Sequence, residues 1–174
     1  HGNLLVFRRP KRYTFRTNMS TYRPNAAVIV TDGNGQVLLC ERADLPGAVQ
    51  TVQGGIDASE SPEQAARREL SEEIGLTHAQ YEIVGSIAEP MRYVWPEEVK
   101  QWFVEHKELS DYDGQEQYFF LAKVDPGVPF NLTAHAQEFS RVWWGTPEEM
   151  VERSWEYKRP ILKSALERFG LLTP

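Results

Sequence analysis

The sequence predicts an α/β (α+β) domain in which a β-sheet has helices packed against it. Strand-like runs alternate with helical periodicity along the chain, and one helix has capping residues at both ends. The 174 residues, of which 41% are hydrophobic, suit one domain with one core. No apolar run approaches the roughly 20 residues that a membrane helix needs. We therefore expect a single domain that does not span a membrane.

A pair of strands opens the domain. β-rich runs at 26–31 and 36–42 are joined by Asp32-Gly33-Asn34-Gly35, whose glycines tolerate a positive φ. This arrangement predicts a hairpin. The other expected strands are 81–88, 117–124 and 139–145, and the other expected helices lie near 97–106, 147–153 and 158–169.

Residues 60–75 have the clearest helical pattern. Ser61 can cap the N-terminus, and Pro62 suits the first helical position because proline has no N–H to leave unpaired. Gln64 completes a capping-box spacing, and Gly75 stands where the helix should stop. Both ends of this helix are therefore expected to be fixed.

One face of the same helix carries Glu69, Glu72 and Glu73 beside an apolar stripe. Like charges three or four residues apart each destabilise an isolated helix by roughly 0.2–0.5 kcal/mol. Arg68 can pair with Glu72, and the remaining counter-charge that we expect is a divalent cation such as Mg²⁺, which prefers carboxylate and carbonyl oxygens. Such an ion suits a phosphoanhydride hydrolase. The alternative is a solvated acidic face.

The residues around this helix resemble the signature of the Nudix hydrolases. They are Gly54, Glu60, Arg68-Glu69-Leu70, Glu72-Glu73 and Gly75-Leu76, all at the spacing of that signature. The resemblance implies the Nudix fold, a mixed β-sheet sandwiched between α-helices. It also implies hydrolysis of a nucleoside diphosphate linked to another group.

For the site, the resemblance implies a divalent metal, Mg²⁺ with Mn²⁺ as a substitute. Glu69, Glu72 and Glu73 would hold it together with a backbone carbonyl of Gln53 or Gly54. Arg68 would orient the acidic cluster.

Segments outside the signature resemble the bacterial RNA 5′-pyrophosphohydrolases and the related dinucleoside polyphosphate hydrolases. They are Tyr22-Arg23-Pro24-Asn25, Gln53-Gly54-Gly55-Ile56, Gly114-Gln115-Glu116-Gln117, Glu138-Phe139, Val142-Trp143-Trp144 and Tyr157-Lys158-Arg159. This subgroup resemblance covers about 22–169, nearly the whole domain.

The subgroup resemblance implies further site residues. Glu138 matches a fourth acid near the metals, and Arg23 matches an arginine whose forked guanidinium meets the phosphates. Residues expected near the 5′-terminal bases, which can stack on aromatic rings and guanidinium planes, are Arg42, Tyr157, Lys158 and, as a looser match, Trp155. Taken singly, each of these residues would be an ordinary surface charge or packing residue.

The resulting hypothesis is an RNA pyrophosphohydrolase that converts a 5′-triphosphate end to a 5′-monophosphate, releasing pyrophosphate and initiating mRNA decay. Its expected partner is therefore a 5′-triphosphorylated RNA end or a nucleotide polyphosphate. The catalytic acids would be Glu69, Glu72, Glu73 and Glu138, with the general base unassigned among them. The alternatives are a diadenosine tetraphosphate hydrolase, a nucleoside triphosphatase, or a non-catalytic nucleotide sensor.

Residues 1–18 have a different charge pattern from the rest. They hold five basic residues and no acid, whereas the whole chain has a formal net charge of -6. We expect a basic N-terminal extension at 1–18, followed by the hydrolase domain at 19–174. The extension is either a segment upstream of a natural start at Met19, a cloning remnant, or an arm that attracts polyanions. Homodimerisation is left open, with this arm as a candidate contact.

Cys40 is the one cysteine of the chain and cannot form an intramolecular disulfide. A reducing compartment, the cytoplasm, is therefore the expected location. The four histidines show no zinc spacing, so an oxygen-bound metal is favoured.

Overall fold

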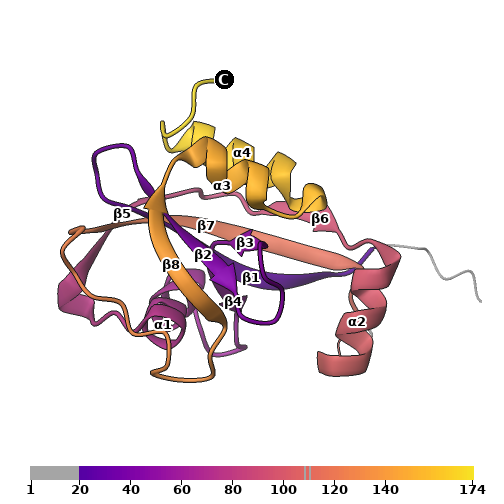
Figure 1. Ribbon diagram of the computed structural model, residues 1–174. Helices are drawn as coiled ribbons and strands as arrows, with labels where there is room; N and C mark the ends of the chain where they lie inside the picture. Colours follow the sequence, from indigo (N-terminus) through magenta and orange to yellow (C-terminus); the bar gives the residue numbers. More distant parts are fainter. Residues whose placement is uncertain (1–19, 108, 110) are drawn as a thin grey trace, which may run out of the picture.

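β1 (Tyr22–Thr31) is the central strand of a mixed β-sheet. The computed structural model describes residues 20–107, 109 and 111–174. In it β1 pairs in parallel with β7 (Gly114–Val124) and antiparallel with β2 (Val37–Arg42) and β4 (Val52–Gly55). The main path of the sheet is β3-β2-β1-β7-β5, while β6 pairs with β7 and β8 with β2 (Figure 1). These outer strands are β3 (Val49–Gln50), β5 (Tyr81–Ser86), β6 (Met91–Val94) and β8 (Phe139–Gly145).

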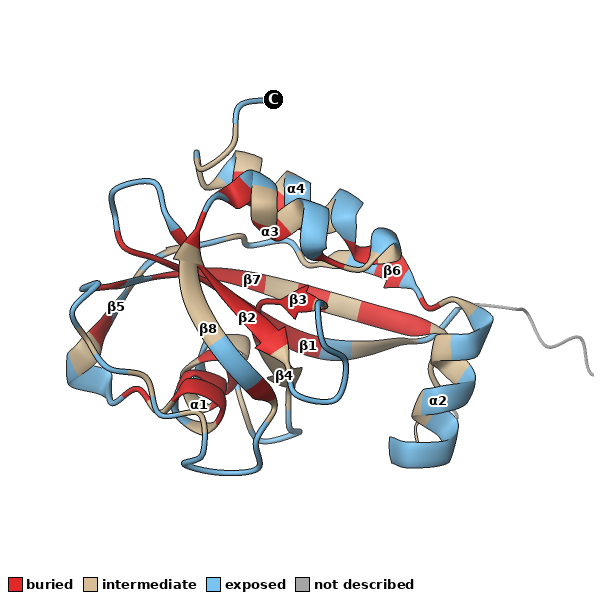
Figure 2. Ribbon diagram, in the orientation of Figure 1, coloured by how far each residue is buried: buried red, intermediate tan, exposed pale blue. Residues whose placement is uncertain are grey.

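Helices cover both faces of the sheet. Val28 of β1 lies in one apolar cluster with Leu70, whereas its neighbour Ile29 lies in a second cluster with Leu166. Successive side chains of a strand point to opposite faces, so β1 is buried on both (Figure 2). The two layers are α1 (Pro62–Ile74) on one side, and α3 (Pro147–Arg153) with α4 (Arg159–Arg168) on the other. The expected sandwich is confirmed.

The expected caps of α1 are present. The Gln64 N–H donates to Ser61 Oγ at 3.2 Å, and the Ser61 N–H donates to Gln64 Oε1 at 2.8 Å. Gly75 ends the helix with a left-handed φ of 70°, and its N–H donates to the carbonyl of Ser71 at 3.1 Å. With both ends fixed, the acidic residues of α1 are held in defined positions relative to the sheet.

Several strand boundaries differ from those expected. β1 begins at Tyr22 rather than at 26, and β7 begins at Gly114 rather than at 117, because these polar residues pair with each other in the parallel ladder. The segment Tyr22–Asn25 therefore lies within the first strand and not before it. The sequence prediction also missed β3, β4 and β6, which are only two to four residues long. β3 pairs with the preceding strand β2, whereas β4 and β6 pair with β1 and β7.

α2 (Glu97–Lys107) has no buried residue and projects from the body of the domain (Figures 1 and 2). Two 3₁₀ helices, η1 (His78–Gln80) and η2 (Glu156–Lys158), complete the elements, and η2 takes the start of what was expected to be the last helix. None of the described helices is long and apolar enough to cross a membrane. The basic extension expected at 1–18 lies outside the described residues.

Candidate active site

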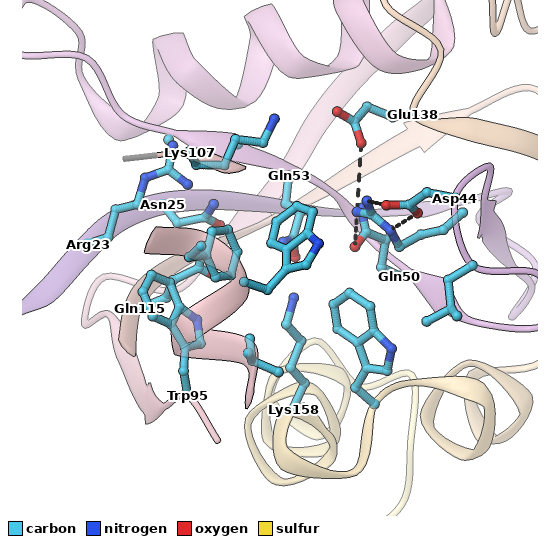
Figure 3. A pocket seen from close by; sticks show the side chains of 18 of the residues that line it. Arg23, Asn25, Asp44, Gln50, Gln53, Trp95, Lys107, Gln115, Glu138 and Lys158 are labelled. Carbon is cyan, nitrogen blue, oxygen red and sulfur yellow. Dashed lines mark hydrogen bonds and ion pairs between the residues drawn. The ribbon is translucent and has the colours of Figure 1, made fainter. Parts of the chain in front are cut away.

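A cavity of about 670 Å³ gathers residues from both sides of the sheet's central strands. Glu138 points into it from one side and Lys158 from the opposite side (Figure 3). Every expected metal or substrate residue lines this cavity: Arg23, Arg42, Gln53, Gly54, Glu69, Glu72, Glu73, Glu138, Trp155, Tyr157 and Lys158. Arg68, expected to orient the acids, is not part of the lining.

Two glycines of β4 bring the backbone close to charged side chains. A Cβ added to Gly54 would overlap the carboxylate of Glu69. A Cβ added to Gly55 would overlap the guanidinium of Arg23. Absence of a side chain at these two positions therefore lets one acid and one arginine reach the same edge of the cavity.

Arg68 holds the acidic cluster together. It binds Glu60 with two hydrogen bonds of 2.7 and 3.0 Å and donates to the carbonyl of Gly55 at 2.8 Å. Its Nη1 donates to Glu69 at 2.5 Å and to Glu72 at 3.2 Å, so the expected pairing with Glu72 is present. The hydrogen bonds to Glu60 raise the pKa of Arg68 above its ordinary value, which keeps this residue a cation.

Negative charge is buried at the centre of the cluster. Glu69 is 7% exposed and Glu73 is 5% exposed. Loss of hydration, followed by the charge of Glu69, raises the pKa of Glu73 well above its ordinary value. Loss of hydration also raises the pKa of Glu69, although Arg68 opposes the shift. Protein cations near these two carboxylates therefore offset only part of their charge.

The donor chemistry of the cluster fits a divalent cation. Glu69 and Glu72 each give one oxygen to Arg68, and Glu73 accepts the N–H of Gln53 on one oxygen at 3.0 Å. The second oxygen of each carboxylate accepts no hydrogen bond from a described residue. No buried side-chain polar atom in the described part of the chain lacks a partner, so these oxygens are open to the cavity. Three such oxygens are the hard ligands that Mg²⁺ or Mn²⁺ prefers. Within the described ranges, no group of three acidic, His or Cys side chains is placed so that it could hold a metal ion without rearranging.

Glu138 comes from the segment directly before β8 and not from α1, which carries the other three acids. Its carboxylate is 3.7 Å from Nη1 of Arg42. Its charge contributes to the raised pKa of Glu73. The structure thus places Glu138 at the same cavity as the helix acids, as an ion-pair partner of Arg42.

Arg42 and Lys158 form a cationic wall over an aromatic ring. The Arg42 guanidinium binds both oxygens of Asp44 at 2.6 Å and lies 5.7 Å from the centroid of the Trp155 ring. Nζ of Lys158 lies 4.8 Å from the same centroid and makes no hydrogen bond or ion pair with a described residue. Burial, together with the charge of Arg42, lowers the pKa of Lys158 to about 7.

Arg23 extends from β1 toward the acids. Within the described part of the chain its guanidinium has no ion-pair partner, and burial lowers its pKa from the ordinary value. Among the residues that the structure describes, neither Arg23 nor Lys158 has an ion-pair partner, and both line a cavity that also holds buried acids. A polyphosphate bound with metal would offer partners to all of them.

Sequence reasoning missed the wall of the cavity made by β6 and α2. Five of its residues are Tyr93, Trp95, Trp102, Phe103 and Lys107. The signal was available in the spacing of Trp95, Val99, Trp102 and Phe103, which places apolar side chains on one side of a helix. The abundance of acidic residues in this stretch obscured that pattern.

Comparisons with known proteins match most of the chain. A family model described as the NUDIX domain matches residues 21–165. The chain is 35% identical to Nudix hydrolase 25 of Arabidopsis thaliana over 154 residues, covering 86% of each. It is also 35% identical to an RNA pyrophosphohydrolase of Nitratiruptor sp. over 152 residues, covering 85% of this chain and 93% of the relative.

Solved structures share the fold at lower identity. The dihydroneopterin triphosphate pyrophosphohydrolase of E. coli superposes with a TM-score of 0.65 at 15% identity, covering 86% of this chain and 97% of that one. An Ap4A hydrolase of C. elegans gives a TM-score of 0.59 at 16% identity, covering 86% and 99%. At these identities the likeness concerns the arrangement of sheet and helices.

Proposed function

Because this chain belongs to the Nudix hydrolase family, we propose that it removes pyrophosphate from the 5′-triphosphate end of RNA and leaves a 5′-monophosphate. Members of the family are hydrolases that generally need divalent metal ions. Mg²⁺, with Mn²⁺ as a substitute, is the ion that we assign to this enzyme. The reaction would be an entry step to mRNA decay in the cytoplasm.

One observation supports this proposal: the acidic cluster lines the same cavity as Arg23 and Lys158, two cationic groups that form no ion pair with any described residue. A triphosphate needs cationic partners for its oxygens, and its metal needs carboxylates. The RNA end as substrate is supported by relatives named RNA pyrophosphohydrolase, which span most of this chain. Aromatic rings on the walls suit the bases attached to that end.

The chain's own residues supply binding, orientation and proton transfer. When bound, a divalent cation neutralises charge on the phosphate chain. The forked guanidinium of Arg23 binds phosphate oxygens. Arg68, which does not line the cavity, keeps Glu69 and Glu72 in place by donating hydrogen bonds to them. A free carboxylate oxygen of the acidic cluster accepts a proton from the water that attacks phosphorus in line. The walls limit access of bulk water to this step.

A comparison of substrates tests the proposal. Purified protein with Mg²⁺ or Mn²⁺ is given triphosphorylated RNA, diadenosine tetraphosphate or a nucleoside triphosphate, and kcat/KM is measured for each. We expect the highest value with RNA and release of pyrophosphate as the product. Glu73→Gln serves as the inactive control. A higher kcat/KM with another substrate would reject RNA as the main one.

A dinucleoside polyphosphate hydrolase is the second candidate. Aromatic rings line two sides of the cavity, with Trp155 and Tyr157 near η2 and Trp102 and Phe103 on α2. A substrate with a base at each end of its phosphate chain could use both sides. The comparison of substrates described above separates this candidate from the first.

A further inference from the structure

α2 presents an aromatic surface to the cavity that the expected site does not use. Trp102 lines the cavity but keeps 38% of its surface exposed. Its ring is stacked on His106 with centroids 4.8 Å apart and meets Phe103 edge-on at 5.2 Å. Phe103 in turn stacks on Trp95 at 4.3 Å. The indole of Trp102 is thus supported by neighbouring rings and still open to a further ring.

The position of this surface is fixed by its anchor on the sheet. Lys100 of α2 makes an ion pair with Asp113, which directly precedes β7. The Trp95 N–H donates to the carbonyl of Asp113 at 2.9 Å. α2 is therefore tied to the edge of the cavity, although none of its residues is buried.

The charges on this wall suit a nucleotide more than an apolar ligand. Lys107, at the last position of α2, lines the cavity and has no ion pair among the described residues. The ammonium of Lys107 could therefore form an ion pair with a phosphodiester. Glu98, on the cavity side near the start of the helix, would repel phosphate but could accept hydrogen bonds from the amino group of a base. A base with an adjacent backbone phosphate satisfies both residues.

The 5′-terminal bases of the RNA already have an expected position on another wall. Arg42, Trp155 and Tyr157 are the residues expected beside the 5′-terminal bases. They come from β2 and the η2 region, whereas Trp102 and Phe103 come from α2. A ring on α2 would therefore belong to a nucleotide further along the chain.

We propose that the α2 wall, centred on Trp102, is a stacking site for a nucleobase downstream of the first nucleotide of the RNA. This inference rests on the proposed function, since it names the part of the RNA that the second aromatic wall recognises. Stacking tolerates any base, so the site selects for the presence of a downstream nucleotide and not for its identity.

The test compares two triphosphorylated substrates that share a first base, a mononucleotide and a trinucleotide. Trp102→Ala should lower kcat/KM for the trinucleotide about tenfold, the loss expected when one stacked ring is removed. It should leave kcat/KM for the mononucleotide unchanged. Trp102→Phe, which keeps a ring, should recover most of the loss.

Val104→Ala is the matched control. Val104 lies on the same helix, is 40% exposed and does not line the cavity. Val104→Ala should leave kcat/KM unchanged for both substrates. Equal losses on both substrates with Trp102→Ala, or no loss on either, would overturn the inference. Diadenosine tetraphosphate is assayed in parallel as a third substrate. If Trp102→Ala lowered kcat/KM for this substrate alone, the inference would also be overturned, because the wall would then hold the distal adenosine.

A binding measurement separates this inference from the proposed function. Titration calorimetry compares a 5′-monophosphorylated dinucleotide with the mononucleotide, and wild-type protein should bind the dinucleotide about tenfold more tightly. Trp102→Ala should abolish that difference. Failure to release pyrophosphate from RNA, with the binding difference intact, would reject the proposed function alone. Release without a binding difference would reject the stacking site alone.

Discussion

The carboxylate of Glu69 occupies the space in which a Cβ on Gly54 would lie. This contact joins α1 to β4 at the centre of the acidic cluster. Gly54→Ala should therefore displace the carboxylate and lower kcat about a hundredfold, the scale associated with misplacing a reacting group by about 1 Å. The cost in the free energy of unfolding should be small, about 1 kcal/mol, since the displaced group is the end of a flexible side chain. Steady-state kinetics and urea denaturation check the two expectations.

Gly127→Ala is the control for this substitution. A Cβ at Gly127 would have its nearest contact at 3.5 Å, an ordinary van der Waals distance, and the residue lies outside the cavity. Its kinetics should match wild type. If Gly54→Ala also retained wild-type kcat, the position of Glu69 would not matter for the reaction.

Arg23→Ala should raise KM more than it changes kcat or stability. The guanidinium has no ion pair to lose in the described protein, but it reaches the edge of the acidic cluster beside Gly55. Arg23→Lys should recover only part of the loss, because an ammonium lacks the fork that binds two phosphate oxygens. Arg92→Ala, which removes an arginine outside the cavity, is the control. An unchanged KM in Arg23→Ala would exclude this residue from the site.

The elements with local signals were the ones that the sequence could predict. Residues 147–153 and 139–145 were correct in both bounds, and the caps of α1 were correct because capping depends on neighbours in sequence. β4 was missed because it consists of Val-Gln-Gly-Gly and exists only through its ladder with β1. Its strand character comes from long-range pairing rather than from residue type.

In the site, too, features with a local sequence signal were predicted, and features that depend on long-range contacts were not. The spacing of Glu69, Glu72 and Glu73 on one helix indicated a cation site before any tertiary contact was known. The clamp of Asp44 on Arg42 could not be foreseen, since it depends on the path of the loop between β2 and β3. Nor could it be foreseen that Lys158 has no ion-pair partner among the described residues, since its amine lies beside the ring of the distant Tyr93 as well as that of the nearby Trp155.

Divalent metal should stabilise the protein through Glu73. An ion present at about a hundred times its dissociation constant adds about 2.7 kcal/mol, or roughly 5–10 °C in Tm for a domain of this size. Glu73→Gln should lose most of this gain and all measurable hydrolysis. Without metal the variant should be at least as stable as wild type, because it removes a carboxylate whose burial raises its pKa. Thermal unfolding with and without Mn²⁺ measures both effects.

Glu82→Gln provides the same chemical change on β5, at an exposed position outside the cavity. It should keep the full metal-dependent rise in Tm. A full rise in Glu73→Gln as well would show that this carboxylate does not hold the ion.

Lys158→Met should stabilise the fold by an amount that depends on pH. Burial and the charge of Arg42 lower the pKa of Lys158 from 10.5 to about 7. Below pH 7 the lysine is charged in both states, so the folded wild type carries the whole cost of burying an ammonium. Between the two pKa values the unfolded chain binds the extra proton, and wild-type stability therefore rises with pH relative to the variant. The advantage of the methionine variant should fall by about 2–3 kcal/mol between about pH 6 and about pH 9.

Urea denaturation without divalent metal measures this difference. Lys163→Met, at an exposed position on α4, should show no such pH dependence. Repeating the comparison in a Glu73→Gln background removes the acid whose charge also acts on Lys158. Because the unpaired amine faces the cavity, the methionine variant should combine higher stability with a higher KM for the triphosphate, the trade expected of a group retained for binding. A pH-independent difference would mean that Lys158 is not held in the weakly hydrated position between Trp155 and Tyr93.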